Sequence, residues 1–121
     1  MIKTVGNYSG RVVDSGNDSL WRWCYQTLSC KNNRCIVIIS AYQVCKQPIR
    51  TRNKIGTLTA TAQQTSMLEM EHRQEKPRSA FITDLNKFIA SIHAAGNGVL
   101  LIGDFNEVLY GPNSGMRKLQ E

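Results

Sequence analysis

The sequence predicts an α+β fold with a mixed, mostly antiparallel sheet. Three observations lead to this fold class. Two runs with strand-like patterning flank a polar turn in the first half of the chain, an apolar stripe at helical spacing follows, and a short apolar run comes last, at residues 99–102. That last run lies between Gly98 and Gly103, and four apolar residues in succession are typical of a strand covered on both faces. We therefore expect a layered protein in which helices pack on a sheet.

The first half of the chain predicts a β-hairpin. Residues 1–20 are rich in Gly, Ser, Asn and Asp, so they supply at most one short strand, around Val12 and Val13. From Trp21 to Thr27, aromatic and strand-favouring residues alternate with other residues, which is the period of a strand with two different faces. A polar turn at residues 31–34 and a more apolar strand at residues 35–44 complete an antiparallel hairpin.

Two helices are predicted after the hairpin. Residues 46–59 are polar and basic, contain Pro48 and Gly56, and predict a loop. Residues 60–75 are mostly good helix formers, so we expect a helix that ends before Pro77. Ser79 is then a suitable N-cap for a second helix, which should stop at Gly96. The apolar residues of this second helix recur at helical spacing: Phe81, Leu85, Phe88, Ile89 and Ile92.

The charge balance favours a polyanionic partner. Fifteen Lys and Arg against nine Asp and Glu give a formal net charge of +6 and a sequence pI near 9.4, which suits DNA or another polyanionic phosphodiester. Four cations, Lys46, Arg50, Arg52 and Lys54, lie in the predicted loop, whose residues 46–54 include no acid. This loop is either a solvated connection or a nucleic-acid-binding segment along a phosphate backbone.

The cysteines do not form a metal-binding pattern. Cys24, Cys30, Cys35 and Cys45 are six, five and ten positions apart, without a Cys-x-x-Cys pair, and this spacing argues against zinc. Cys30 and Cys35 flank the predicted turn, so a disulfide between them is sterically conceivable. Reduced thiols in an intracellular protein are the default. The sequence predicts no signal peptide and no membrane span, because no run approaches about 20 apolar residues.

The tetrapeptide Gly-Asp-Phe-Asn at residues 103–106 is the strongest functional signal. It follows the last predicted strand, and strand ends carry the chemistry in α/β proteins. In extended backbone Asp104 and Asn106 share one side and Phe105 points to the other. A carboxylate there could orient a metal-bound water, and a carboxamide could donate an N–H group to a phosphate oxygen. The alternative is an Asx turn that only caps the strand.

This box, together with other segments, resembles the endonuclease/exonuclease/phosphatase superfamily, and within it the endonuclease domains of non-LTR retroelements. The resemblance covers residues 10–111. It rests on Arg22-Trp23, on the strand end Ser40-Ala41-Tyr42-Gln43-Val44-Cys45, on Ala62-Gln63-Gln64, on Pro77-Arg78 with Phe81, Asp84 and Leu85, and on the box with Glu107. It implies part of a four-layer α/β sandwich and a phosphodiesterase that nicks DNA with Mg²⁺ or Mn²⁺. A retroelement protein of this kind would act in the nucleus.

The resemblance also implies roles for particular residues. Asp104, Asn106 and Tyr42 are the candidate catalytic residues, with Asp104 as a metal ligand and Tyr42 as a phosphate contact. Arg22 and Arg78 match recurrent positions and are minor candidates for contacts with the nucleic-acid backbone. The metal-binding glutamate of the family comes from an earlier strand, so that role does not pass to Glu107.

Other parts of the family pattern are missing. The early Asn and Glu that help to hold the metal have no counterpart, nor does the late Ser-Asp-His box, and His72 and His93 lie outside any motif. The chain has 121 residues, whereas single sandwich domains commonly need about 200–250. We therefore expect a fragment of one domain that is inactive or nearly so by itself, because such catalytic residues act as a unit.

Two other interpretations stay open. One is a non-catalytic nucleic-acid-binding remnant. The other is a fragment that is unfolded or depends on a partner, since half a sandwich exposes sheet edges and apolar surface. The box is also shared by inositol-lipid phosphatases and by nucleases that act on RNA.

Overall fold

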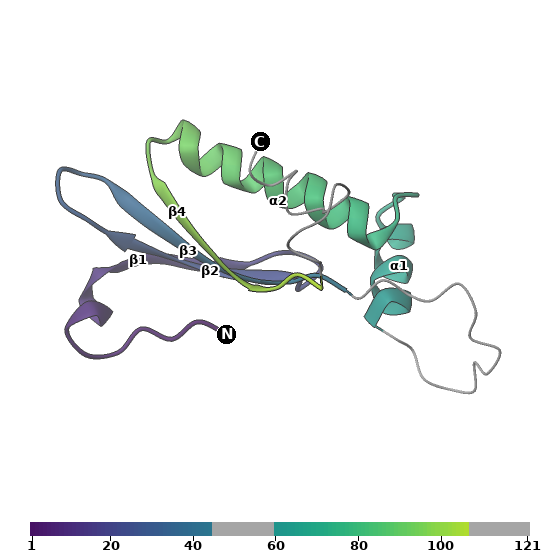
Figure 1. Cartoon of the computed structure of the whole chain (residues 1–121), viewed down its shortest axis with the longest axis horizontal. Helices are drawn as coiled ribbons and strands as arrows, with labels where there is room; N and C mark the ends of the chain where they lie inside the picture. The colour runs from purple at the N-terminus through teal and green to yellow at the C-terminus, as the bar shows by residue number, and fades with distance from the viewer. Residues whose placement is uncertain (45–59, 107–121) are drawn as a thin grey trace.

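The computed structural model describes residues 1–44 and 60–106. In chain order its elements are η1 (Gly6–Arg11), β1 (Val12–Asn17), β2 (Trp23–Ser29), β3 (Cys35–Tyr42), α1 (Ala60–Met70), α2 (Pro77–Ala94) and β4 (Gly98–Asp104), as Figure 1 shows. The predicted loop at residues 46–59, with Lys46, Arg50, Arg52 and Lys54, lies outside the described residues, and so does Glu107.

The four strands form one sheet in the order β1-β2-β3-β4. β1 pairs with β2 and β2 pairs with β3 in antiparallel fashion, whereas β3 and β4 are parallel. The predicted α+β fold with a mixed, mostly antiparallel sheet is therefore confirmed. The chain reaches β4 through α1 and α2, and α2 lies across one face of the sheet while η1 and the N-terminal segment lie on the other side (Figure 1).

The predicted hairpin is formed by β2 and β3. Its turn has Asn32 and Asn33 in the left-handed region, with φ of 60° and 57°, and the Arg34 N–H group donates to the Lys31 carbonyl oxygen at 3.4 Å. Two successive left-handed residues make the type I′ turn that matches the twist of paired strands, and Asn tolerates this conformation well. The strand register follows from this turn.

The register does not favour the conceivable disulfide between Cys30 and Cys35, and both are free thiols. Cys35 pairs with Ser29 across the hairpin. Because successive strand residues point to opposite faces, Cys30 projects from the other side of the ribbon.

The second helix begins earlier than predicted. Ser79 is not its N-cap, since α2 starts at Pro77 with Lys76 as the N-cap residue. Proline suits the first helical position because its fixed φ is helical and its missing N–H would have no partner there. The predicted stop is confirmed: α2 ends at Ala94, and Gly96 has φ 78° with its N–H group donating to the His93 carbonyl oxygen.

The first helix ends at Met70 rather than at residue 75. His72 has φ 58°, and the Arg73 N–H group donates to the Leu68 carbonyl oxygen at 2.8 Å. This turn stops α1 and directs Arg73 towards α2.

The main hydrophobic core lies between the sheet and α2. Trp23 of β2 stacks on Phe88 with ring centroids 6.0 Å apart and meets Phe81 edge to face at the same distance. The buried residues of this core are Trp23, Val37, Ile39, Ala41, Phe81, Leu85 and Ile92. The helical stripe predicted from the sequence is therefore the face of α2 that holds it on the sheet.

The expectation that the last strand is covered on both faces is wrong. Val99 and Leu101 of β4 pack against the core, but Leu100 and Ile102 are 47% and 46% exposed. The physical reason is that α2 covers one face of β4, and no described element covers the other.

We call this second side of the sheet the open face. By strand register it carries Cys24, Gln26 and Leu28 of β2, Ile36, Ile38 and Ser40 of β3, and Leu100 and Ile102 of β4. The N-terminal segment crosses part of it, because the Gln26 side chain bonds with Thr4 and donates to the Ile2 carbonyl oxygen. Within residues 1–44 and 60–106, no helix is both long and apolar enough to cross a membrane.

Candidate functional site

Tyr42 and Asp104 lie side by side at the carboxyl ends of β3 and β4. They are partners in the parallel register, and the ladder continues beyond them because the Gln43 N–H group donates to the Asp104 carbonyl oxygen at 2.9 Å. Carboxyl ends of neighbouring parallel strands are where open sheets collect ligand-binding groups. The structure therefore brings together two of the three candidate catalytic residues by main-chain pairing alone.

Gly103 makes this close approach of the two strand ends possible. Its φ is 144°, and a Cβ atom built at this position would lie 1.8 Å from the Ala41 carbonyl oxygen. Only a residue without a side chain allows β4 to lie so close to β3 here. The glycine of the Gly-Asp-Phe-Asn box is thus required by the sheet itself.

Asp104 and Asn106 form an Asx turn, the alternative that the sequence left open. The Asn106 N–H group donates to Asp104 Oδ1 at 3.0 Å, and Asn106 adopts φ 46°. Its Nδ2 group donates to the Gln43 carbonyl oxygen at 2.6 Å, so the carboxamide ties the turn to the end of β3. Asn106 reaches its place through this left-handed turn rather than by the strand alternation that we expected.

Phe105 points to the covered side, as expected. Its ring lies 6.3 Å from the ring of Phe81 at the start of α2, and it packs against the main core. This contact fixes the turn on the first part of α2, so that Asp104 and Asn106 are held on a rigid base.

Tyr42 and Asp104 keep groups that remain available to a ligand. Tyr42 is 43% exposed, and Asp104 is an exposed residue. Within the described residues, neither the Tyr42 hydroxyl nor Asp104 Oδ2 has a hydrogen-bond partner. The site thus presents one phenol and one carboxylate oxygen.

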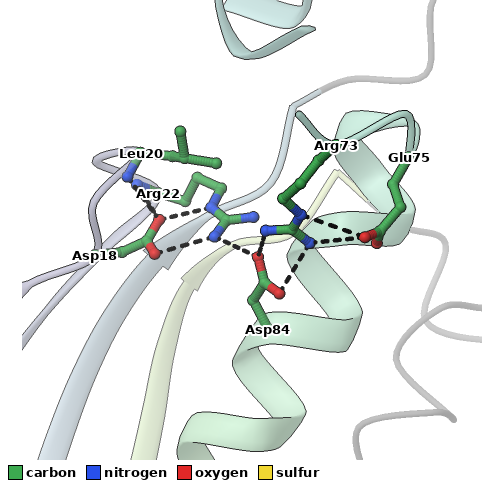
Figure 2. Close-up of polar contacts among 6 residues, drawn as sticks. All are labelled: Asp18, Leu20, Arg22, Arg73, Glu75 and Asp84. Atoms are coloured by element: carbon green, nitrogen blue, oxygen red, sulfur yellow. Dashed lines mark hydrogen bonds and ion pairs between the residues drawn. The ribbon is translucent and has the colours of Figure 1, made fainter. Parts of the chain in front are cut away.

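Arg22 is not available for the nucleic-acid contact suggested by the resemblance, because it is 3% exposed. It donates to Asp18 through Nε at 2.6 Å and through Nη2 at 3.0 Å, and Nη2 also donates to Asp84 Oδ2 at 2.8 Å. Arg73 donates to the same Asp84 through Nη1 at 2.7 Å and to Glu75 at 3.0 Å. Figure 2 shows how this ion-pair network links the start of β2 to α2 and to the turn after α1.

The network changes the proton affinity of its acid. Burial alone would raise the pKa of Asp84, but the hydrogen bonds from Arg73 and Arg22 and their positive charges outweigh burial, and the pKa is lowered. Asp84 is therefore held as a carboxylate between two guanidinium groups. On the Arg22 side of the network, the Nη1 group is buried and has no hydrogen-bond partner in the described part of the chain.

Arg78 also has a structural role. Its Nη1 group donates to the Val44 carbonyl oxygen, and Nη2 donates to the Asn106 carbonyl oxygen at 3.4 Å. The side chain thus joins the exit from β3 to the turn after β4, and positions the backbone around the candidate site.

Next to Tyr42, at the same end of the sheet, is a pocket of about 410 Å³. Its lining includes Asn17, Trp21, Cys24, Ser40 and Tyr42. Trp21 is not a strand residue, contrary to the prediction, because β2 starts at Trp23 and Trp21 has φ 58°. The sequence analysis did not predict this pocket. A signal for it was Asp18, because its carboxylate accepts the N–H groups of Leu20 and Arg22 and so shapes the turn that carries Trp21.

The described residues supply few metal ligands. No group of three or more His, Cys, Asp or Glu residues suited to an ion occurs among them. His72 and His93 are exposed, and His93 lies in the last turn of α2, whereas Phe105 contacts Phe81, the fifth residue of the helix. Residues 81 and 93 are twelve positions apart in this helix, so His93 lies about 18 Å from the place where Phe105 contacts α2.

Comparisons with protein-family models, with curated proteins and with solved structures give no match for this chain.

Proposed function

We propose that the chain is part of a metal-dependent phosphodiesterase domain, of the DNA-nicking endonuclease type found in retroelements. The observation that carries this proposal is the pairing of Tyr42 with Asp104 at the ends of two parallel strands. A phenol hydroxyl can donate to a phosphate oxygen, and a carboxylate oxygen can accept a hydrogen bond from a water. The formal net charge of +6 favours a polyanionic substrate.

The residues fit a magnesium ion that is shared with the substrate. In proteins Mg²⁺ is often bound through one or two carboxylates, with waters and substrate phosphate oxygens as its other ligands. Asp104 supplies one exposed carboxylate for such an ion, and Mn²⁺ could take the same place. When bound, the ion would neutralise charge on the phosphate, next to which a bare carboxylate would be repulsive.

The chain by itself should hydrolyse DNA slowly or not at all. Asp104 supplies a single carboxylate. His93 is too far away to assist it, because about 18 Å of α2 separates His93 from the turn that holds Asp104. Phosphodiester hydrolysis needs several groups that act together, and the loss of one of them removes most of the rate. We propose that the missing groups come from a second sheet, which would complete a four-layer sandwich by packing on the β4 part of the open face. Leu100 and Ile102 support this arrangement, because both are exposed and neither lines the pocket beside Tyr42.

The proposal is tested by DNA binding in the presence of Mg²⁺ or a chelator. Asp104→Asn removes the charge but keeps an oxygen that can accept the Asn106 N–H group. Asp14→Asn is the matched control, because Asp14 is an exposed acid of β1 and its loss changes the net charge equally. Two unit charges about 4 Å apart in water interact by about 1 kcal/mol, or about fivefold in affinity.

We expect the wild-type chain to bind DNA about fivefold more tightly with Mg²⁺ than with chelator. Asp104→Asn should bind more tightly than the wild type in chelator and should lose the response to Mg²⁺, whereas Asp14→Asn should keep that response. Equal binding with and without Mg²⁺ in the wild-type chain would contradict the proposal. Nicking of supercoiled plasmid by the wild-type chain, abolished in Asp104→Asn, would instead show that the chain is a minimal nuclease.

The alternative is a non-catalytic nucleic-acid-binding remnant. It is favoured by the Asx turn, because Asp104 Oδ1 and Asn106 Nδ2 are both engaged in bonds that cap the strands. A remnant of this kind would bind DNA in a salt-dependent way, without nicking and without a difference between Asp104→Asn and Asp14→Asn.

A further inference from the structure

The pocket beside Tyr42 has two exposed aromatic side chains in its lining. Trp21 is 76% exposed and Tyr42 is 43% exposed, and both contact the pocket of about 410 Å³. Its volume falls within the range of about 300–1,000 Å³ that is usual for ligand sites. A side chain as large as tryptophan is usually buried, so its exposure at the edge of a pocket is unusual. Exposed aromatic side chains are common in binding surfaces.

Trp21 is held in its exposed position by the backbone. Its φ of 58° is a conformation that bulky residues rarely adopt. The Trp21 N–H group donates to the Asp18 carbonyl oxygen at 3.0 Å. The N–H groups on either side, of Leu20 and Arg22, donate to Asp18 Oδ2 at 3.3 and 3.4 Å (Figure 2). Strained residues that the surroundings fix in this way cluster at functional sites.

Polar side chains complete the pocket. Asn17 of β1, Cys24 of β2 and Ser40 of β3 are in its lining. Among the described residues, the side chains of Asn17 and Ser40 have no hydrogen-bond partner. A ligand in the pocket would therefore meet an aromatic ring, a phenol, and free donors and acceptors.

We infer that this pocket binds an unpaired base of single-stranded nucleic acid, with Trp21 stacked on the base and the Tyr42 hydroxyl near the adjoining phosphate. The inference rests on the proposed function in taking nucleic acid as the substrate. A base is planar and has polar edges, so it matches an aromatic ring beside an amide and a hydroxyl. The negatively charged phosphate backbone of the same strand suits a chain with a formal net charge of +6.

The test compares a short thymidine oligomer with an oligomer of the same length that lacks its bases. The key variant is Trp21→Gly, because glycine adopts a positive φ freely and the turn should keep its shape. Trp21→Phe keeps a ring for stacking. Tyr8→Ala is the matched control, since Tyr8 is 66% exposed on η1 and is not in the pocket lining. Urea midpoints of all variants confirm that each is folded.

We expect Trp21→Gly to bind the thymidine oligomer about tenfold more weakly than the wild type and to bind the abasic oligomer equally well. Trp21→Phe should lose less, and Tyr8→Ala should be unchanged. The oligomer should also quench the fluorescence of Trp21, whereas a Trp21→Phe protein, whose one remaining tryptophan is Trp23, 7% exposed at the wall of the same pocket, should show weaker quenching.

Three outcomes would overturn the inference. Unchanged binding of the thymidine oligomer by Trp21→Gly would exclude stacking but leave the proposed function standing. Equal weakening for both oligomers would mean that Trp21 contacts the backbone rather than a base. Binding of neither oligomer by the wild-type chain would overturn this inference, whereas the response of DNA binding to Mg²⁺ would still decide the proposed function separately.

Discussion

Replacement of Gly103 by alanine should strongly destabilise the sheet. The added Cβ atom would lie 1.8 Å from the Ala41 carbonyl oxygen and 2.8 and 2.9 Å from the carbonyl carbon and the nitrogen of Ala41. Ordinary contact begins at 3.4 Å, so β4 would have to move from β3 by at least 1.6 Å, the difference between 3.4 and 1.8. The neighbouring atoms are backbone atoms of a central strand, so no side chain can rotate to relieve the clash.

The magnitude follows from two contributions. An unfavourable backbone conformation at φ 144° costs about 1–3 kcal/mol for a residue with a side chain. The displacement would also weaken the last hydrogen bonds of the β3 and β4 pair, including that from Gln43 to Asp104, at about 1 kcal/mol each. We expect a loss of about 3–5 kcal/mol in the free energy of unfolding, a large part of the about 5–15 kcal/mol of a typical domain.

Gly98→Ala is the matched control in the same strand. A Cβ atom there would meet only Ile36 Cγ1, at 3.9 Å, so the variant should be neutral or more stable by about 0.4–1 kcal/mol. Urea unfolding followed by the fluorescence of buried Trp23 measures both variants. A difference below about 0.5 kcal/mol between Gly103→Ala and Gly98→Ala would refute the close approach of β4 to β3.

The remaining predictions concern the ion-pair network and the open face. Asp84→Asn removes the carboxylate shared by Arg22 and Arg73, and because Arg22 is buried we expect urea unfolding to show a loss of about 2–4 kcal/mol. Glu75→Gln removes a partly exposed partner and should cost less than about 0.5 kcal/mol; an equal loss in both variants would contradict the role of Asp84. Since the pKa of Asp84 is lowered by folding, its stabilisation is complete above its unfolded value of about 3.9 and is lost as the pH falls through its lower folded value. Asp84→Asn should therefore lose less stability than the wild type over that acidic range, and parallel pH profiles would exclude this linkage. Leu100→Thr should cost less than about 1 kcal/mol, because the side chain is already 47% exposed, and should reduce the binding of a hydrophobic dye to the open face; a loss of several kcal/mol would show that this face is covered.

Local sequence signals were reliable wherever a short segment decides its own conformation. The period of two in the hairpin strands, the polar turn with Asn32 and Asn33, and the glycine that stops α2 all depend on neighbouring residues, and the structure agrees with each. The start of α2 was predicted wrongly, because Pro77 can open a helix as well as interrupt one. The chemistry of the box was only partly predictable, since the same residues serve an Asx turn and a catalytic site.

The sequence by itself determined the α+β class, the order of the strands and helices, and the position of Asp104 at a strand end, because these follow from periodicity and turn chemistry within a few residues. Only the tertiary structure decided which groups meet. The pairing of Tyr42 with Asp104 depends on the parallel register of strands that lie 62 positions apart, and the burial of Arg22 depends on a carboxylate in α2, also 62 positions away. Such contacts are set by how α2 packs on the sheet, and no local pattern specifies them. The same packing leaves Leu100 and Ile102 exposed and positions Trp21 beside Tyr42.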